Sequence, residues 1–174
     1  MVERLPEGPQ WLYEVKFDGY RAIAVKNGDQ VEIRSRNDKN LTAAYPTVGA
    51  AVKRLRSHDV VLDGEIVAVD HEGRPSFQAL QHRSARTNHK IAYYVFDVLH
   101  EGGMPLTDLP LEERRAILTR ILKDSELLMS LELPGTAADI IKAVSALRLE
   151  GVIAKRRDSK YQGGERSGGQ VFQR

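Results

Sequence analysis

The sequence predicts an α+β protein whose sheets are largely antiparallel. Runs rich in β-branched and aromatic residues alternate with stretches that show the 3.6-residue spacing of amphipathic helices. The sharpest turn signal, Asn27-Gly28, stands between two strand-like runs, and both of its residues tolerate a positive φ. Because tight turns join antiparallel neighbours, strands connected in this way belong to antiparallel sheets.

The first strand-like run covers residues 11–25 and is interrupted near Gly19. Alternation within this run places an apolar set on one face, namely Trp11, Tyr13, Val15 and Phe17. The other face takes Leu12, Glu14, Lys16 and Asp18. An amine held between two carboxylates, above an apolar face, is typical of a functional site.

The remaining elements follow the same two patterns. We expect further strands over residues 31–36, 60–69, 91–99 and 150–155. We expect helices over residues 45–56, 76–87, 110–122 and 136–149. Pro46 suits a first helical turn, and Thr136 with Asp139 forms a helix cap. A turn at 71–74 and a glycine-rich loop at 161–170 complete the chain.

Carboxylates occur in three of the expected strand regions, where ionised groups are costly unless they bind something. They are Glu65, Asp97 and Glu150, and two lysines, Lys16 and Lys155, occupy comparable positions. This combination predicts one charged cleft suited to a Mg²⁺–nucleotide complex. Mg²⁺ prefers hard oxygen ligands, and the lysines neutralise phosphate charge.

The composition excludes several classes of site. The 174 residues include no cysteine, which excludes disulfides, thiolate metal sites and thiol nucleophiles. The five histidines show no spacing typical of metal ligands. No run has the apolar length of a membrane helix, and the N-terminal residues lack a signal-peptide core. We therefore expect one cytoplasmic domain over residues 1–174, and a monomer.

The net charge is only +2, but cations gather in two short stretches. One stretch carries Arg156, Arg157 and Lys160, and the other carries Arg34, Arg36 and Lys39. Such patches suit phosphate backbones, including nucleic acid. A solvated basic face explains the composition equally well.

Residues 16–21, Lys-Phe-Asp-Gly-Tyr-Arg, place a lysine, a carboxylate and an arginine on one short turn. A nucleophilic lysine needs a lowered pKa, which desolvation or a neighbouring cation provides. A neighbouring carboxylate can orient the amine or accept its proton. The alternative for this hexapeptide is a salt-bridge cluster at the end of a strand.

Four motifs, in order, resemble those of ATP-dependent DNA ligases, which are covalent nucleotidyltransferases. The hexapeptide resembles their first motif, K-x-D-G-x-R. The other three are Asp63-Gly-Glu65, Tyr94-Val-Phe-Asp97 and Glu150-Gly-Val-Ile-Ala-Lys155. The resemblance covers nearly the whole chain. The local sequence is most similar to the ligase module of bacterial end-joining proteins of the ligase D type. It implies an ATP-grasp-like covalent nucleotidyltransferase fold.

The resemblance also implies a reaction and its cofactors, ATP and Mg²⁺. Lys16 is expected to attack the α-phosphate of ATP, release pyrophosphate and become a lysyl-AMP phosphoramidate. AMP then passes to a 5′-phosphate of nicked or broken duplex DNA, and a 3′-hydroxyl displaces it. The expected setting is DNA repair and recombination at the nucleoid.

The implied site residues fall into three groups. The nucleotide-binding group is Glu14, Arg21, Arg36, Glu65, Phe96, Ile153 and Lys155. Phe96 and Ile153 are expected to stack on the two faces of adenine, while Glu65 and Glu150 contact ribose or metal. Lys155 is expected to contact the α-phosphate. The expected DNA contacts are Arg34, Arg36, Lys39, Arg156, Arg157 and Lys160.

The C-terminal stretch departs from the family pattern. A fifth motif of the family carries two lysines, where this chain has Phe172 and Arg174, and Gln170 replaces a tryptophan. Phenylalanine supplies no charge to a phosphate, and no OB-fold follows within these residues. We therefore expect slow self-adenylylation, and weak sealing of nicks unless a separate OB-fold domain or end-joining proteins assist.

Other functions stay open at this point. An RNA ligase or an RNA-capping nucleotidyltransferase would share the same motifs. A nucleotide-binding or DNA-end-binding module with little catalysis would explain the altered fifth motif. A trial of ATP against GTP, and a test for covalent adenylate, separates these functions.

Overall fold

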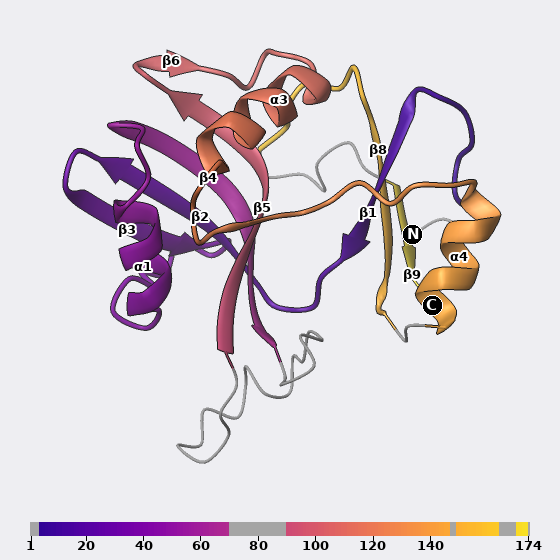
Figure 1. The fold of residues 1–174 in the computed structure, drawn as a ribbon, viewed down its shortest axis with the longest axis horizontal. Coiled ribbons are helices and arrows are strands. Elements are labelled where there is room, and N and C mark those ends of the chain that lie inside the picture. The colour runs from indigo at the N-terminus through magenta and orange to yellow at the C-terminus, as the bar shows by residue number, and fades with distance from the viewer. Residues whose placement is uncertain (1–3, 70–89, 147–148, 164–169, 174) are drawn as a thin grey trace. The chain divides into compact units, whose positions relative to one another are not determined.

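The structure is a computed structural model that describes residues 4–69, 90–146, 149–163 and 170–173. The chain divides into two compact units. The first unit comprises Met1–Phe17, Thr107–Glu113 and Ser130–Arg174. The second unit comprises Asp18–Leu106 and Arg114–Met129. Figure 1 traces the elements along the chain.

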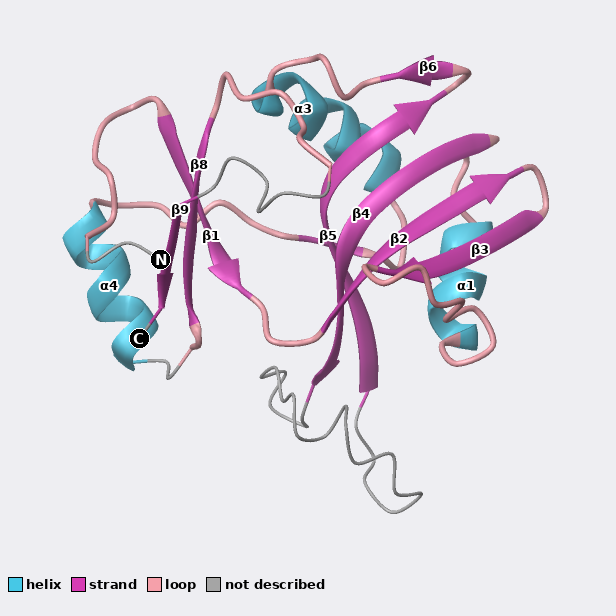
Figure 2. Cartoon of the chain, turned by 180° about the vertical axis from the view of Figure 1, so that it is seen from behind, coloured by secondary structure: helices cyan, strands magenta, loops and turns pink. Residues whose placement is uncertain are grey.

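The first unit contains a three-stranded antiparallel sheet in the order β1-β8-β9. Its strands are β1 (Trp11–Lys16), β8 (Gly151–Arg156) and β9 (Gln170–Gln173). Helix α4 (Ala137–Ala146) lies beside this sheet (Figure 2) and buries Ile140 and Val144 against Tyr13. One face of β1 is therefore the apolar, helix-covered face that the alternation predicts.

The cap of α4 has the predicted partners. The Thr136 hydroxyl donates to the Asp139 carboxylate over 2.6 Å, and the Asp139 amide donates back to that hydroxyl over 3.2 Å. This reciprocal pair satisfies backbone donors at the helix start, which fixes where the helix begins.

The second unit contains a sheet in the order β3-β2-β4-β5-β6, and β7 also pairs with β5. Its strands are β2 (Tyr20–Asn27), β3 (Gln30–Ser35), β4 (Asp59–Val69), β5 (Lys90–Glu101), β6 (Met104–Pro105) and β7 (Leu128–Met129). Every described pairing is antiparallel except β5 with β7. The expectation of largely antiparallel sheets is confirmed.

Two helices belong wholly or mostly to the second unit. They are α1 (Pro46–Lys53), with the predicted proline at its start, and α3 (Leu111–Leu122). Helix α1 was expected to reach residue 56, and it ends earlier. The buried Lys26 ammonium donates to the Leu55 carbonyl over 2.5 Å and to the Ser57 carbonyl over 2.6 Å. This cation takes the carbonyls that follow the helix and holds them in a loop.

The hairpin between β2 and β3 differs from the prediction by one residue. Asn27 pairs with Gln30, so the two-residue turn is Gly28-Asp29, with Gly28 at φ 58°. Asn27 stays in the strand because it also pairs with Asp59 of β4. Pairing with β4 therefore shifts the turn by one residue, and a prediction from local turn residues does not include this pairing.

Other outcomes concern the ends of the chain. The predicted loop at 161–170 extends one residue too far, because residue 170 is the first residue of β9. The turn at 71–74 and the helix at 76–87 lie outside the described residues, as does the C-terminal part of the 136–149 helix from residue 147. None of the described helices has both the length and the apolar composition of a membrane span.

Candidate active site

Two ion pairs join β1 to β8 in the first unit. Lys16 ends β1 opposite Gly151, and its ammonium bonds the carboxylate of Glu150, which immediately precedes β8. Both side chains keep 24% of their surface exposed. A lysine in this place is accessible to a ligand while a carboxylate fixes its direction.

The second pair lies two residues back along β1 and is far more buried. The Lys155 ammonium donates to Glu14 over 2.7 Å, with Glu14 1% and Lys155 8% exposed. A carboxylate this buried requires a partner, and Lys155 provides it. Ile153 pairs in register with Glu14, so its side chain belongs to the same face.

The sequence placed Asp18 on this face as well, and the structure corrects that. Strand β1 ends at Lys16, and Asp18 belongs to the second unit. The alternation of the strand therefore stops before it reaches Asp18. The charged face of β1 is formed by Glu14 and Lys16, with the apolar Leu12 completing it.

In the second unit, Arg21 of β2 binds Asp63 of β4 with two hydrogen bonds. Its Nε donates over 3.1 Å and its Nη2 over 2.7 Å. Asp63 is fully buried, and the guanidinium compensates its charge through a planar fork. The same guanidinium stands 5.5 Å from the centre of the Phe96 ring, within range of a cation–π contact. Arg21 is thus held in one orientation.

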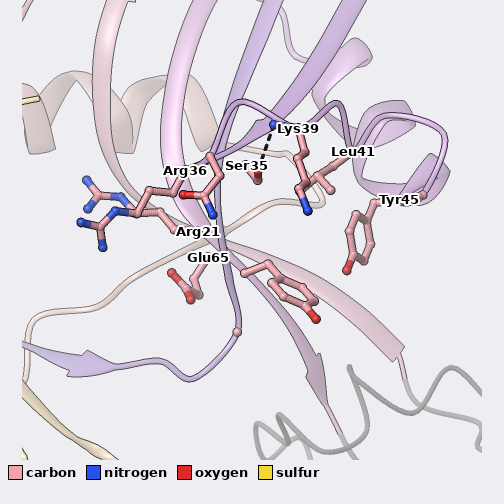
Figure 3. A pocket seen from close by; sticks show the side chains of 11 residues that line it. Arg21, Ser35, Arg36, Lys39, Leu41, Tyr45 and Glu65 are labelled. Carbon is pink, nitrogen blue, oxygen red and sulfur yellow. Dashed lines mark hydrogen bonds between the residues drawn. The ribbon is translucent and has the colours of Figure 1, made fainter. Parts of the chain in front are cut away.

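A pocket of 620 Å³ opens beside this pair. Figure 3 shows Arg21, Arg36 and Lys39 around it, with Glu65 and the Tyr45 ring at its border. The segment 35–39, which begins at the last residue of β3, lines part of this pocket. Two hydrogen bonds hold it: the Ser35 amide donates to the Lys39 carbonyl, and the Lys39 amide donates to the Ser35 hydroxyl. Three cations, one carboxylate and an aromatic ring suit the phosphate, sugar and ring system of a nucleotide.

Asp97, which the sequence placed in the charged cleft, has another role. Arg114 of α3 binds it with two hydrogen bonds of 2.8 and 2.9 Å, and both residues are buried. The carboxylate is therefore committed to a helix–strand contact. Sequence reasoning missed Arg114 because no local signal marks it: it stands between the charged Glu113 and Arg115, yet the structure buries it.

The predicted DNA-contacting cations divide into two sets. Four of them have acidic partners: Arg34 with Glu32 and Asp38, Arg156 with Asp158, Arg157 with Glu132, and Lys160 with Asp108. The hydrogen bond from Arg34 to Asp38 raises the pKa of that guanidinium above its usual value. In the described part of the chain no ion pair engages Arg36 or Lys39, and both line the pocket. These two are the cations best placed to meet a phosphate.

The glycines of two motifs are required by packing. A side chain at Gly19 would overlap the Ile66 carbonyl, and one at Gly64 would come within 2.5 Å of the Tyr94 carbonyl. Neither glycine has a positive φ, so close approach of another strand explains them both.

The described residues contain no group of three or more acidic or histidine side chains that could enclose a metal ion. Mg²⁺ does not need one, because it keeps several waters and binds through one or two carboxylates and the phosphates of its nucleotide. The half-buried Glu65 and the partly exposed Glu150 are carboxylates of the type it uses. Each of these carboxylates, considered within its own unit, therefore suits a magnesium ion that arrives with a nucleotide.

Comparison with known proteins adds to this geometry. A family model described as "ATP dependent DNA ligase domain" matches residues 2–171. The "Multifunctional non-homologous end joining protein LigD" of Mycolicibacterium smegmatis is 40% identical over 158 residues, covering 91% of this chain and 20% of that protein. The LigD protein of Pseudomonas aeruginosa is 38% identical, covering 93% of this chain and 20% of that protein. This chain thus spans about a fifth of the length of these relatives.

Solved structures agree. The ligase domain of Mycobacterium tuberculosis LigD has a TM-score of 0.84 and 34% identity, and the match covers 96% of this chain and 56% of that one. A mycobacterial DNA ligase D complexed with ATP and MES also has a TM-score of 0.84, with 33% identity and coverage of 96% and 55%. The α+β fold of this chain is that of a ligase D ligase domain.

Proposed function

This chain belongs to the ATP-dependent DNA ligase domain family, and we propose that Lys16 is the nucleophile that takes AMP from ATP. The observation that carries the proposal is the pair of ion contacts between β1 and β8. They present one partly exposed lysine, Lys16, beside a second, buried one, Lys155. Lys155 is buried and held by Glu14, while the partly exposed Lys16 is accessible to a substrate.

In the proposed step the Lys16 nitrogen forms a bond to the α-phosphorus, and the bond from that phosphorus to the pyrophosphate oxygen breaks. The amine must lose a proton before or during attack. Its contact with Glu150 orients it, and the same carboxylate is the nearest acceptor for that proton. Lys155 contacts the α-phosphate oxygens, where negative charge accumulates.

The second unit supplies the residues for the sugar and the base. Arg21 and Glu65 contact the ribose, and Arg36 meets a phosphate at the pocket. Phe96 of this unit stacks on adenine, because a flat aromatic ring excludes water from a base. Ile153, which belongs to the first unit, is proposed as a further apolar contact to the base. Mg²⁺ would neutralise phosphate charge when bound, and Glu65 of the second unit and Glu150 of the first are the carboxylates proposed to hold it.

The second half of the proposed reaction is transfer of AMP to a DNA 5′-phosphate, followed by strand joining in repair. Arg36 and Lys39 are the proposed contacts to the DNA backbone, ahead of the four cations that already have acidic partners. The named relatives are multifunctional end-joining proteins. We propose that broken duplex DNA and other end-joining modules are the partners here, in the cytoplasm, with the chain itself a monomer.

A binding module with little catalysis is the second candidate, and one observation favours it. Phe172, at the position of a family lysine, packs against the apolar cluster under α4. That position cannot supply a charge to ATP. If this candidate is correct, the chain binds ATP or DNA ends without forming covalent adenylate.

Incubation with α-labelled ATP and Mg²⁺ separates the two candidates. The protein is expected to take up label that survives denaturation and is released by acid, as a lysine phosphoramidate is. The variant Lys16→Ala should take up none, whereas the surface variant Lys53→Ala should label like the wild type. If neither the wild type nor Lys53→Ala takes up label but both still bind ATP, the result supports the binding module. A parallel trial with labelled GTP tests the capping-type alternative.

A further inference from the structure

Phe96 lies in an irregularity of β5. Asp63 of β4 pairs with Asp97, but the next residue, Gly64, pairs with Val95, so no residue of β4 stands opposite Phe96. A bulge of this kind adds one residue to a strand and turns its side chain away from the regular alternation. The direction of the Phe96 ring is therefore set by whatever holds the bulge in place.

One side of the bulge is fixed by a buried ion pair. Arg114 of α3 binds Asp97 through Nε and Nη2, at 2.8 and 2.9 Å. Asp97 also accepts a hydrogen bond of 2.9 Å from the Val98 amide. Arg114 is 2% and Asp97 5% exposed, so water cannot replace either partner. The fork holds the Asp97 carboxylate, and the Val98 amide ties that carboxylate to the backbone that follows Phe96 in the chain.

The other side of the bulge is fixed by close packing. A side chain on Gly64 would lie 2.5 Å from the Tyr94 carbonyl and 2.6 Å from the Tyr93 ring. The Tyr93 hydroxyl donates to the Ala22 carbonyl over 2.7 Å, which ties this ring to β2. The residues before the bulge cannot shift toward β4, because the backbone there already touches its neighbour.

We propose that Arg114, acting through Asp97, is a positioning residue that orients the Phe96 ring for a purine base. The inference rests on the proposed function, in which Phe96 stacks on the adenine of ATP. Arg114 touches neither substrate nor the reacting atoms. Its contribution is to hold the bulge, and Arg21 adds a contact to the ring at 5.5 Å.

A contact on the same helix and strand provides a matched control. Arg120 of α3 donates to Glu101 of β5 over 2.5 Å, the same chemistry between the same two elements. Glu101 pairs in regular register with Val60, and Arg120 is 65% exposed. Arg120→Lys changes a helix–strand ion pair without touching the bulge.

The test compares ATP affinity with the rate of Lys16 labelling at saturating ATP. Phe96→Ala sets the scale, and we expect it to weaken ATP binding about 5- to 150-fold, the range measured for loss of base stacking. Arg114→Lys keeps the charge but loses the fork, and Asp97→Asn keeps the shape but loses the charge. We expect each to weaken ATP binding at least about fivefold, on that same scale, while the saturated labelling rate stays within about twofold.

Base selectivity gives a second readout that a general loss of stability does not change. In the wild type, ATP should be preferred over UTP, because a purine offers the larger stacking surface. Arg114→Lys and Asp97→Asn should reduce that preference, and Arg120→Lys should leave it unchanged. All measurements are made below the melting temperature of each variant. If one of the two bulge variants does not fold, the other decides.

The outcomes separate this inference from the proposed function. If the wild type neither binds ATP nor takes label, the proposed function fails. If Phe96→Ala weakens ATP binding but Arg114→Lys and Asp97→Asn behave like Arg120→Lys, the inference alone is overturned. If Phe96→Ala has no effect on ATP binding, the stacking role of Phe96 is wrong and the inference fails with it.

Discussion

The two units hold their charges with different chemistry. On the β1–β8 face of the first unit both cations are lysines, and one of them, Lys16, is partly exposed. Beside β4 in the second unit the buried carboxylates Asp63 and Asp97 are each held by an arginine fork. Arginine stays charged at any accessible pH, whereas lysine can lose its proton. This contrast agrees with the proposed function, in which Lys16 must lose a proton while the arginines keep their charge.

The register explains why the second unit needs two forks. Asp63 and Asp97 are direct partners across β4 and β5, and like charges in that relation repel. Each carboxylate is buried, so each must have its own guanidinium. The first unit avoids this cost by setting opposite charges beside one another across the strands.

The largest expected effect is the loss of covalent labelling when Lys16 is given the arginine chemistry of the second unit. Lys16→Arg keeps the positive charge and a contact to Glu150, but a guanidinium does not lose its proton. We expect covalent labelling by ATP to fall at least about a thousandfold, the order found when a covalent nucleophile is removed. Mass spectrometry for one added adenylate measures this, and a variant that still gained AMP would contradict the assignment.

The next effect concerns stability. Arg21→Met leaves the fully buried Asp63 without its guanidinium partner. We expect the free energy of unfolding to fall by about 3–5 kcal/mol. Lys16→Met removes a partly exposed partner and should cost about 1 kcal/mol. Urea titrations of both variants test the contrast. Equal losses would show that the two units do not differ in the way their charges are held.

A smaller effect tests the packing behind the forks. Gly64→Ala forces a methyl group against the Tyr94 carbonyl, and we expect a loss of about 1–3 kcal/mol. The matched change Gly49→Ala, in α1, finds its nearest neighbour at 4.0 Å and should stabilise the protein by about 0.5–1 kcal/mol. Thermal melting of the two variants should shift in opposite directions. A shift of both in the same direction would refute the packing explanation.

The smallest effect is the pH dependence of an exposed carboxylate. Hydrogen bonds from Thr136 lower the pKa of Asp139 below its usual value. Its stabilising contribution is therefore complete above the unfolded pKa and is lost as the pH falls through the lower, folded pKa. Urea midpoints between about pH 5 and pH 2 should fall more steeply for the wild type than for Asp139→Asn. If the urea midpoints of the two proteins fall equally with pH, the Thr136–Asp139 cap does not contribute to the acid sensitivity of the fold.

Much of the fold follows from local sequence. The alternation of β1, the proline at the start of α1 and the Thr136–Asp139 cap are all interactions between near neighbours, so their patterns are visible in the sequence. The motif order likewise identified the family, because spacing along the chain is preserved when strands keep their order. These features required no knowledge of the partners of each strand.

Other features depended on residues distant in sequence. The turn after Asn27 moved because β4 pairs with it, and α1 ended early because Lys26 takes carbonyls beyond the helix. Asp97 was assigned to the cleft because its charge was visible and Arg114 was not recognisable as its partner. Each error concerns a choice between two partners for the same group, and only the folded chain decides that choice.

The sequence by itself determined the family, the nucleophile candidate and where most strands lie along the chain, since these are encoded by residue type and spacing. Only the tertiary structure decided which carboxylate each cation neutralises, which of the predicted DNA-binding cations line a pocket, and that Phe96 lies in a bulge. The reason is physical: a charge or a strand pairs with whatever lies a few ångströms away. That neighbour is supplied by chain segments tens of residues distant in sequence.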